Sequence, residues 1–170
     1  RSLGTVLARV LETLEGLKTL TNRVHRHGGI IFAQLAHAGS QSRVPGNVPL
    51  APSPVANPLT GNDVKEASDA EISQTVEAFA IAARRAVAAG FDGVHIHAAN
   101  GYRISEFTSP VTNRRSDVWG GNPLQRDAFP KAVVGAVRAA VPAGFPVAMK
   151  IGFVDAVPDG LEVVESVRRA

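Results

Sequence analysis

Three polar residues occupy matching places in three short apolar segments of the chain, and their types suit a binding or catalytic site. Gln34, His97 and Lys150 each lie near the carboxyl end of a segment that the sequence predicts to be a buried strand. A single buried glutamine or histidine is usually a hydrogen-bonded core residue. A lysine near the end of a buried strand is costly unless it is paired or hydrated. Three such residues at equivalent positions on successive strands therefore predict a shared site.

The alternation of side chains along a strand predicts where these residues point. Residues two apart on a strand share a face, so His97 lies on the same side as His95. Gln34 and Lys150 stand at the corresponding positions of the other two strands. In a (β/α)8 barrel, inward-facing residues at the carboxyl ends of the strands meet at the rim where active sites form.

Other chemistries remain as alternatives. His95 and His97 could supply two metal ligands on one face of a strand end. A zinc or iron site needs a further histidine or carboxylate, and the other strands offer Gln34 and Lys150, which are poor ligands. The sequence contains neither a serine nucleophile elbow nor a Gly-x-Gly-x-x-Gly segment after a strand. A metal-dependent barrel hydrolase is therefore the third choice.

The segments that must position these residues alternate between helix and strand. The predicted helices cover residues 3–27, 68–90, 122–141 and 161–169, and the predicted strands cover 30–35, 91–97 and 145–151. Gly16 interrupts the first helical pattern, which predicts either two helices or one helix weakened in the middle. Pro130 kinks the third helix or resets its start. Buried strands that alternate with amphipathic helices predict parallel pairing through right-handed crossovers and hence an α/β fold.

Two long connections separate these elements. Residues 37–67 have no usable hydrophobic period and carry several prolines. A structureless stretch of this length inside a compact domain is more often functional than idle, so we predict an ordered loop over a site. Residues 100–121 are predicted to form a second, polar loop.

Length and composition bound the class of protein. The chain has 170 residues, a net charge of +3, 45% hydrophobic residues and no cysteine. Scattered basic residues without interleaved aromatics argue against nucleic-acid binding, and no apolar stretch approaches the length of a membrane span. The chain begins at Arg1 and shows no targeting signal, so we expect a cytoplasmic protein whose sequence starts within a longer chain.

Several separate motifs resemble the Old Yellow Enzyme family of flavin-dependent ene-reductases. The longest runs from His95 to Pro110 and continues from Thr112 to Gly121, with the family's Gly-Tyr, Asn-Arg-Arg and Gly-Gly segments in order. Residues 34–39 (Gln-Leu-Ala-His-Ala-Gly) and 51–54 (Ala-Pro-Ser-Pro) agree in order and spacing. Residues 90–94 lead into the histidine strand as they do in the family.

The resemblance implies a (β/α)8 barrel that binds FMN at its mouth and uses NADH or NADPH to reduce an activated alkene, such as an enone or a nitroalkene. It implies that His97 and Asn100 bind the substrate oxygen, where negative charge develops, and that Tyr102 donates the proton. By the same resemblance, Gln34 bonds the pyrimidine edge of the flavin. Lys150 stands near flavin N1, where many members of the family have arginine.

The chain is shorter than a closed barrel, which takes roughly 250 residues. Its three predicted strands resemble the third to fifth strands of the family's barrel, so residues 1–170 are predicted to form a partial FMN-binding barrel domain. We expect a fragment limited to these residues to be inactive on its own. A non-catalytic remnant or an interaction module without flavin is the alternative. The predicted ligands are small molecules, with no nucleic acid and no membrane.

Overall fold

The computed structural model describes residues 3–57 and 60–170, with side chains from residue 13 onward. Pro58 and Leu59 of the long predicted loop therefore lie outside the described residues, as do the first apolar side chains of the first predicted helix. The elements are, in chain order, α1 (Leu3–Arg26), β1 (Phe32–Leu35), the 3-10 helix η1 (Gly39–Gln41), β2 (Leu50–Ala51), β3 (Lys65–Glu66), α2 (Asp69–Ala88), β4 (Gly93–Ala98), α3 (Arg103–Thr108), α4 (Pro123–Arg126), α5 (Ala128–Ala140), β5 (Val147–Ile151) and α6 (Val163–Arg169).

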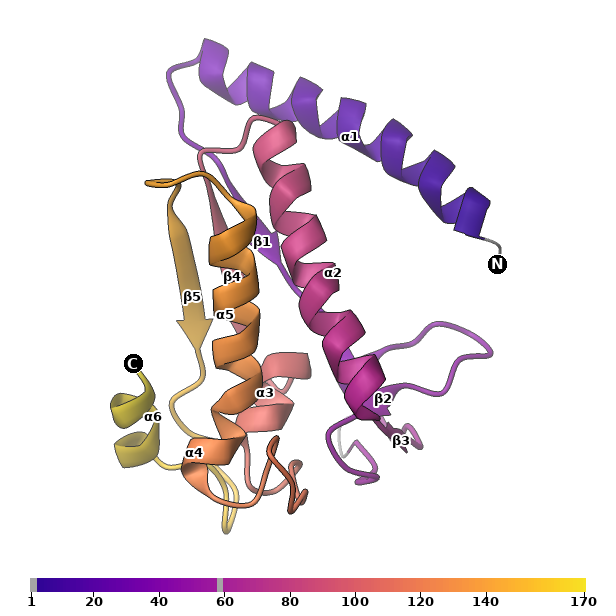
Figure 1. Ribbon diagram of the computed structural model, residues 1–170, viewed down its shortest axis with the longest axis vertical. Coiled ribbons are helices and arrows are strands. Elements are labelled where there is room, and N and C mark those ends of the chain that lie inside the picture. Colours follow the sequence, from indigo (N-terminus) through magenta and orange to yellow (C-terminus); the bar gives the residue numbers. More distant parts are fainter. Residues whose placement is uncertain (1–2, 58–59) are drawn as a thin grey trace.

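A parallel sheet in the order β1-β4-β5 forms the centre of the fold, and helices α2 and α5 lie side by side over one of its faces (Figure 1). The predicted parallel pairing of successive strands is confirmed. Each strand is joined to the next through a helix, as a parallel connection requires. The carboxyl ends of all three strands therefore lie at the same end of the sheet, which is the end near α3.

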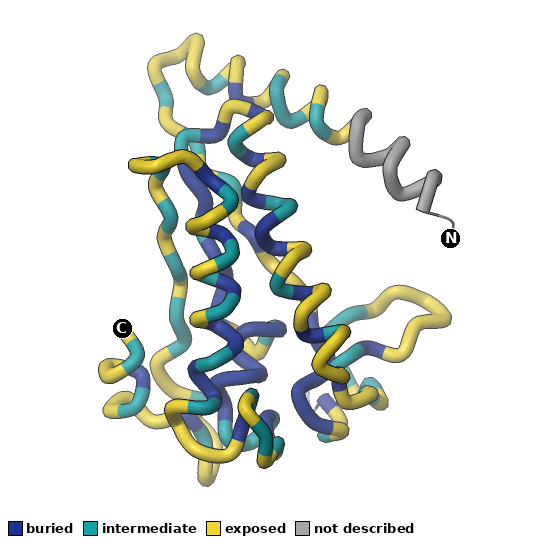
Figure 2. Tube along the Cα trace, in the orientation of Figure 1, coloured by how far each residue is buried: buried dark blue, intermediate teal, exposed yellow. Residues whose placement is uncertain are grey.

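The prediction that all three strands are buried is wrong for β1 and β5. Only β4 is buried along most of its length, whereas Phe32 of β1 is 41% exposed and β5 alternates between half-buried and exposed residues. The reason is that β1 and β5 are the outer strands, and the sheet face turned away from α2 and α5 is open in the described part of the chain. Figure 2 shows the buried positions concentrated between the two helices and β4.

Two apolar layers meet between the sheet and the helices. Val94 and Ile96 of β4 are fully buried, and Phe79 of α2 and Val133 of α5 are part of the same core cluster. Phe129 at the start of α5 stacks on Phe107 of α3 with ring centroids 4.2 Å apart. The core thus connects the sheet, the covering helices and the short helix that follows β4.

The predicted starts of two helices are confirmed. Ser68 and Glu71 form a complete capping box at the start of α2, in which the Ser68 hydroxyl accepts from the Glu71 backbone and the Glu71 carboxylate accepts from the Ser68 backbone. Asn122 and Gln125 make the equivalent pair at the start of α4. The single helix predicted over 122–141 is divided at Asp127 into α4 and α5, and Pro130 stands in the first turn of α5, where proline is tolerated.

The polar loop predicted for residues 100–121 is wrong over residues 103–108, where the structure has helix α3. Ile104 and Phe107 are three residues apart on this helix and are both fully buried. Two apolar residues among polar neighbours give too weak a period for a sequence prediction, yet here the helix is buried on every side.

Helix α1 is continuous through Gly16, so the alternative of two separate helices is wrong. Its last turns attach to the domain through Thr21, whose hydroxyl donates to Ala89 O at 2.6 Å, and through His25, whose Nε2 lies 2.9 Å from Asp92 Oδ2. Gly28, with φ of 71°, ends the helix as the sequence predicts. None of the described helices, α1 included, is long and apolar enough to cross a membrane.

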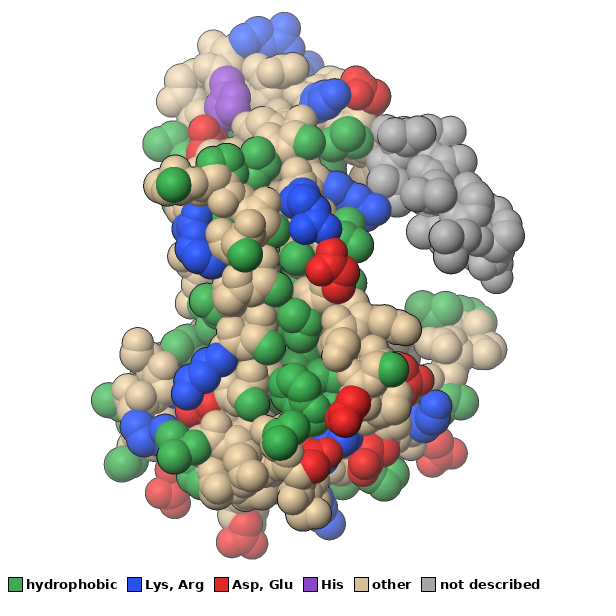
Figure 3. All heavy atoms as spheres, in the orientation of Figure 1, with side chains coloured by type: hydrophobic (Ala, Val, Ile, Leu, Met, Phe, Trp, Pro, Cys, Tyr) green, Lys and Arg blue, Asp and Glu red, His purple; other side chains and the backbone are tan. Residues whose placement is uncertain are grey.

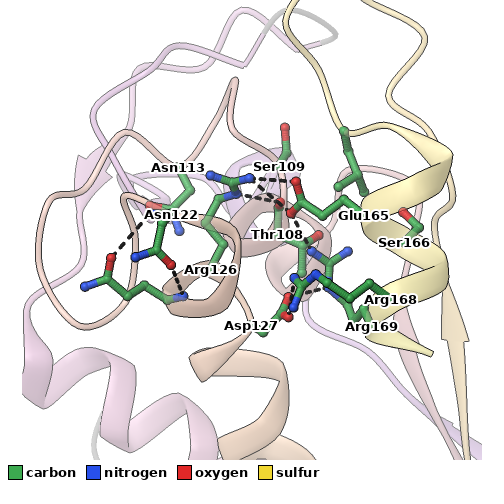
Figure 4. Close-up of polar contacts among 12 residues, drawn as sticks. Thr108, Ser109, Asn113, Asn122, Arg126, Asp127, Glu165, Ser166, Arg168 and Arg169 are labelled. Atoms are coloured by element: carbon green, nitrogen blue, oxygen red, sulfur yellow. Dashed lines mark hydrogen bonds and ion pairs between the residues drawn. The ribbon is translucent and has the colours of Figure 1, made fainter.

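A cluster of ion pairs attaches the C-terminal helix α6 to α4 and α5 (Figure 4). Arg126 bonds both Glu165 oxygens, at 3.0 and 2.8 Å, and its Nε donates to Thr108 O. The buried Asp127 carboxylate accepts from Arg168 at 2.9 Å and from Arg169 at 2.5 Å. On the helical side of the molecule seen in Figure 3, basic and acidic side chains are interspersed.

Candidate active site

The predicted polar residues share the open face of the sheet near the strand ends. Gln34 is the register partner of His95, and His97 is the register partner of Lys150. Because register partners on parallel strands point to the same side, these four residues lie on one face. Gln34 Nε2 and His95 Nδ1 are 3.0 Å apart, so the carboxamide is already oriented by a neighbour. Gln34 and Lys150 are exposed, and Ala148 beside them leaves the face uncrowded.

His97 is the buried member of this group, with 6% of its surface exposed. Its Nδ1 is buried and has no hydrogen-bond partner among the described residues. Burial lowers the pKa of His97, and the nearby positive charge of Lys150 and the side chain of His95 lower it further. The ring is therefore neutral at neutral pH, and a neutral imidazole offers one N–H as a hydrogen-bond donor.

Tyr102 lies directly beside His97. The two ring centroids are 5.1 Å apart and the ring planes are at 77°, an edge-to-face contact. Tyr102 is half-buried and stands at the N-cap of α3, four residues beyond the end of β4. The phenol and the imidazole thus come from two different elements and meet at the end of β4.

The turn between β4 and α3 contains Asn100 and Gly101, both in the left-handed region with φ of 61° and 68°. Left-handed geometry suits asparagine and glycine better than other residues. Gln41 of η1 holds this turn, since its Nε2 donates to Asn100 O and to Gly101 O, both at 2.9 Å. Asn100 is exposed. The sequence analysis missed Gln41, because nothing local connects it to a turn about sixty residues later.

The long loop is ordered by a buried carboxylate. Glu106 of α3 is 2% exposed, and its Oε1 accepts from the Ser40 backbone at 2.8 Å and from the Ser40 hydroxyl. Asn57 in turn donates to the Ser40 hydroxyl oxygen at 2.6 Å. Burial raises the pKa of Glu106, and the two Ser40 donors oppose that shift. This network ties η1 and the loop to the helix that Tyr102 begins.

Other motif residues connect loops rather than face the open side of the sheet. Arg115 donates to Pro52 O at 3.0 Å and to Ala67 O at 2.8 Å, and it pairs with Asp117. The Arg114 backbone donates to the Ser53 hydroxyl at 2.9 Å. The Asn-Arg-Arg and Ala-Pro-Ser-Pro motifs therefore bind each other. These contacts give both motifs a structural role that needs no part in the chemistry.

The donor set of the open face fits a flavin better than a metal ion. A carboxamide such as Gln34 both donates and accepts, as the alternating N–H and C=O groups of a flavin pyrimidine edge require, and Lys150 adds positive charge. Within the described residues, no group of three His, Asp or Glu side chains is placed to hold a metal ion. His95 and His97 share a face, but their neighbours are an amide and an ammonium group.

The chain is similar in sequence to known oxidoreductases. The sequence pattern of the NADH:flavin oxidoreductase / NADH oxidase family matches residues 10–170. The NADPH dehydrogenase of Geobacillus thermodenitrificans is 45% identical over 154 residues, which are 91% of this chain and 44% of that protein. The NADH oxidase of Thermoanaerobacter brockii is 38% identical over 140 residues, which are 81% of this chain and 22% of that protein.

Two solved reductase structures contain the same fold over most of this chain. Morphinone reductase in complex with tetrahydroNAD superposes with a TM-score of 0.74 at 32% identity, covering 81% of this chain and 43% of that one. A 2-naphthoyl-CoA reductase superposes with a TM-score of 0.85 at 26% identity, covering 92% of this chain and 26% of that one.

The parallel sheet covered by helices gives the chain an α/β fold, with polar side chains near the carboxyl ends of its strands. The chain belongs to the NADH:flavin oxidoreductase / NADH oxidase family, as the Old Yellow Enzyme resemblance predicts. It spans less than half the length of the two relatives named above.

Proposed function

We propose that this chain supplies the third to fifth strands of a (β/α)8 barrel that binds FMN and reduces activated C=C bonds, in enones and nitroalkenes, at the expense of NADH or NADPH. The observation that carries the proposal is the placement of five polar residues at or just beyond the carboxyl ends of the parallel strands. These residues are Gln34, Lys150, His97, Asn100 and Tyr102. When bound, reduced FMN supplies the hydride for the alkene.

The flavin-facing roles fall to the two exposed side chains. Gln34 is held at 3.0 Å from His95, so its amide can meet the pyrimidine edge of the ring in a fixed orientation. Lys150 places one positive charge beside the same edge, where negative charge accumulates on reduction. A lysine keeps the charge of the arginine common in the family but loses its two-pronged hydrogen bonding.

The substrate-facing roles fall to residues at the end of β4. The neutral His97 ring donates a hydrogen bond to the substrate oxygen, with the Asn100 side chain as second donor. These bonds strengthen as negative charge builds on that oxygen. Tyr102, in contact with His97, is the proton donor to the carbon next to the carbonyl or nitro group.

The test uses the complete barrel protein that contains this chain. We expect the purified protein to hold FMN and to reduce cyclohexenone with NADPH. His97→Ala should weaken phenol binding and slow enone reduction by about 10²–10³-fold, the effect of removing one donor to a developing oxyanion, while FMN binding is nearly unchanged. His25→Ala is the matched control, because His25 lies at the opposite end of the sheet, beside Asp92.

Two outcomes contradict the proposal. A full-length protein that holds no flavin favours the alternative of a non-catalytic member of the family. Unchanged enone reduction and unchanged phenol affinity in His97→Ala remove His97 from the site.

A further inference from the structure

Arg103, the residue after Tyr102, is a buried cation without an acceptor. It is 2% exposed, and its Nε and Nη1 are buried and have no hydrogen-bond partner among the described residues. Buried polar groups in proteins nearly always have a partner, and a buried charge without one is costly. Tyr102 contacts His97, whereas Arg103 lines a cavity to which neither Tyr102 nor His97 contributes.

This cavity lies between the loop that follows β1 and the first half of α2, and it has a volume of about 570 Å³. That volume is within the range of small-molecule sites. The loop contributes His37 to its wall, β2 contributes Leu50, β3 contributes Lys65, and α2 contributes Glu71 and Thr75. Figure 1 shows β2 and β3, two of the elements that line it, beside the first turns of α2. The lining does not include the candidate site residues Gln34, His97, Asn100, Tyr102 and Lys150.

Burial lowers the pKa of Arg103 and the charges of Glu106 and Glu71 oppose that shift, but neither carboxylate accepts a hydrogen bond from its Nε or Nη1. Glu71 Oε1 is 3.3 Å from Lys65 Nζ, and Glu71 Oε2 accepts from the Ser68 backbone and hydroxyl. Both oxygens are thus engaged in the capping box and the lysine pair. Glu106, the other nearby acid, bonds Ser40 through Oε1, and its buried Oε2 has no hydrogen-bond partner among the described residues. The wall therefore has two cations, Lys65 and Arg103, against one carboxylate that is already bonded.

His37 adds a second donor beside the guanidinium. Its Nδ1 accepts a hydrogen bond from the Gly39 backbone at 3.0 Å, so the proton of the neutral ring is on Nε2. Although His37 is exposed overall, partial desolvation of its ring and the charge of Arg103 lower its pKa, which keeps the ring neutral at neutral pH. The backbone links the two residues as well, since Arg103 N donates to His37 O at 3.1 Å.

We propose that this cavity is an anion-binding site, in which the guanidinium of Arg103 and the Nε2–H of His37 bind the carboxylate or phosphate group of a small molecule. An oxyanion supplies the hydrogen-bond acceptors that Nε and Nη1 of Arg103 lack. This cavity is separate from the candidate active site, although Arg103 in its wall directly follows Tyr102 in the chain. The inference stands independently of the proposed function.

The experiment measures ligand binding and needs neither NADPH nor an alkene. The full-length protein is titrated with inorganic phosphate and, separately, with acetate, at constant ionic strength maintained with chloride, and binding is followed by calorimetry and by the melting temperature. We expect saturable binding of at least one of the two anions. Phosphate alone identifies a phosphate site, and acetate alone identifies a carboxylate site.

Variants assign the binding to this cavity. Arg103→Leu should weaken anion binding by about 10–100-fold, the effect of removing a hydrogen bond to a charged group. Leucine removes a buried charge but also a cation that favours the ionised form of Glu106, so the melting temperature of the variant without added anion is measured first. Arg85→Leu is the matched control, since Arg85 is exposed on α2, and it should bind as the wild type does.

Two results overturn the inference: the absence of saturable binding of either anion, or equal binding by Arg103→Leu and the wild type. If Arg103→Leu does not fold, His37→Phe replaces the second donor with a ring of similar shape. That variant should weaken binding by about tenfold, and an unchanged affinity would overturn the inference equally.

Discussion

Removing only the hydroxyl of Tyr102 separates proton donation from every other role of this residue. Phenylalanine retains the ring that meets His97 edge to face, with centroids 5.1 Å apart. The structure shows no hydrogen bond from the Tyr102 hydroxyl to another described residue, so Tyr102→Phe leaves no protein group unpaired. We therefore expect a change in the free energy of unfolding within ~0.5 kcal/mol, the range of neutral substitutions.

The kinetic effect should be large and confined to one half of the reaction. A positioned general acid contributes roughly 10²–10⁴-fold, which is ~2.7–5.5 kcal/mol at 1.36 kcal/mol for each factor of ten. The proton is needed when the alkene is reduced and is not needed when NADPH reduces the flavin. Reoxidation of the flavin by cyclohexenone should slow by that factor, and flavin reduction by NADPH should keep its rate.

Anaerobic stopped-flow absorbance of the full-length protein measures both halves separately. Equal slowing of the two halves would indicate that Tyr102 only shapes the site. An unchanged rate of reoxidation would mean that another group donates the proton, and the reasoning from the contact with His97 would be refuted.

Three further predictions concern stability. Ser68→Ala should lower the free energy of unfolding by about 1 kcal/mol in urea denaturation, because it removes the N-cap of α2, and an unchanged midpoint would contradict the capping box. Phe129→Ala should cost about 3–5 kcal/mol, since the buried ring stacks on Phe107, and a loss below about 1 kcal/mol would contradict that contact. Glu106 has a pKa raised above 4.5, so its ionisation opposes folding. Wild-type stability should therefore fall relative to Glu106→Gln as the pH rises above 4.5 through the raised pKa, whereas a difference that is constant with pH would contradict the shift.

The sequence predicted the strands and their common face because these depend on local, periodic features. The side chains of His95 and His97 share a face on any extended strand, and parallel neighbours align their ends. The burial of β1 and β5 could not be predicted in this way, because it depends on which strands are central. Phe32 is apolar and still 41% exposed, since it belongs to an outer strand.

The supporting residues of the site could not be predicted, because their contacts join distant parts of the chain. Gln41 holds a turn about sixty positions later, and Ser40 binds Glu106 across a similar distance. Helix α3 could not be predicted from its polar sequence, because Arg103 and Glu106 are buried through tertiary packing rather than through hydrophobicity. The motifs around Arg115 indicated the family correctly, but only the structure shows that they connect loops.

The central claim is that Gln34 and Lys150 face a bound flavin while His97, Asn100 and Tyr102 face the substrate. The most direct measurement is the crystal structure of the full-length protein with FMN and a phenol. We predict the pyrimidine edge of the flavin within hydrogen-bond distance of Gln34, its N1 beside Lys150, and the phenol oxygen between His97 and Asn100. A flavin bound elsewhere, or a phenol oxygen that contacts neither His97 nor Asn100, would contradict the account.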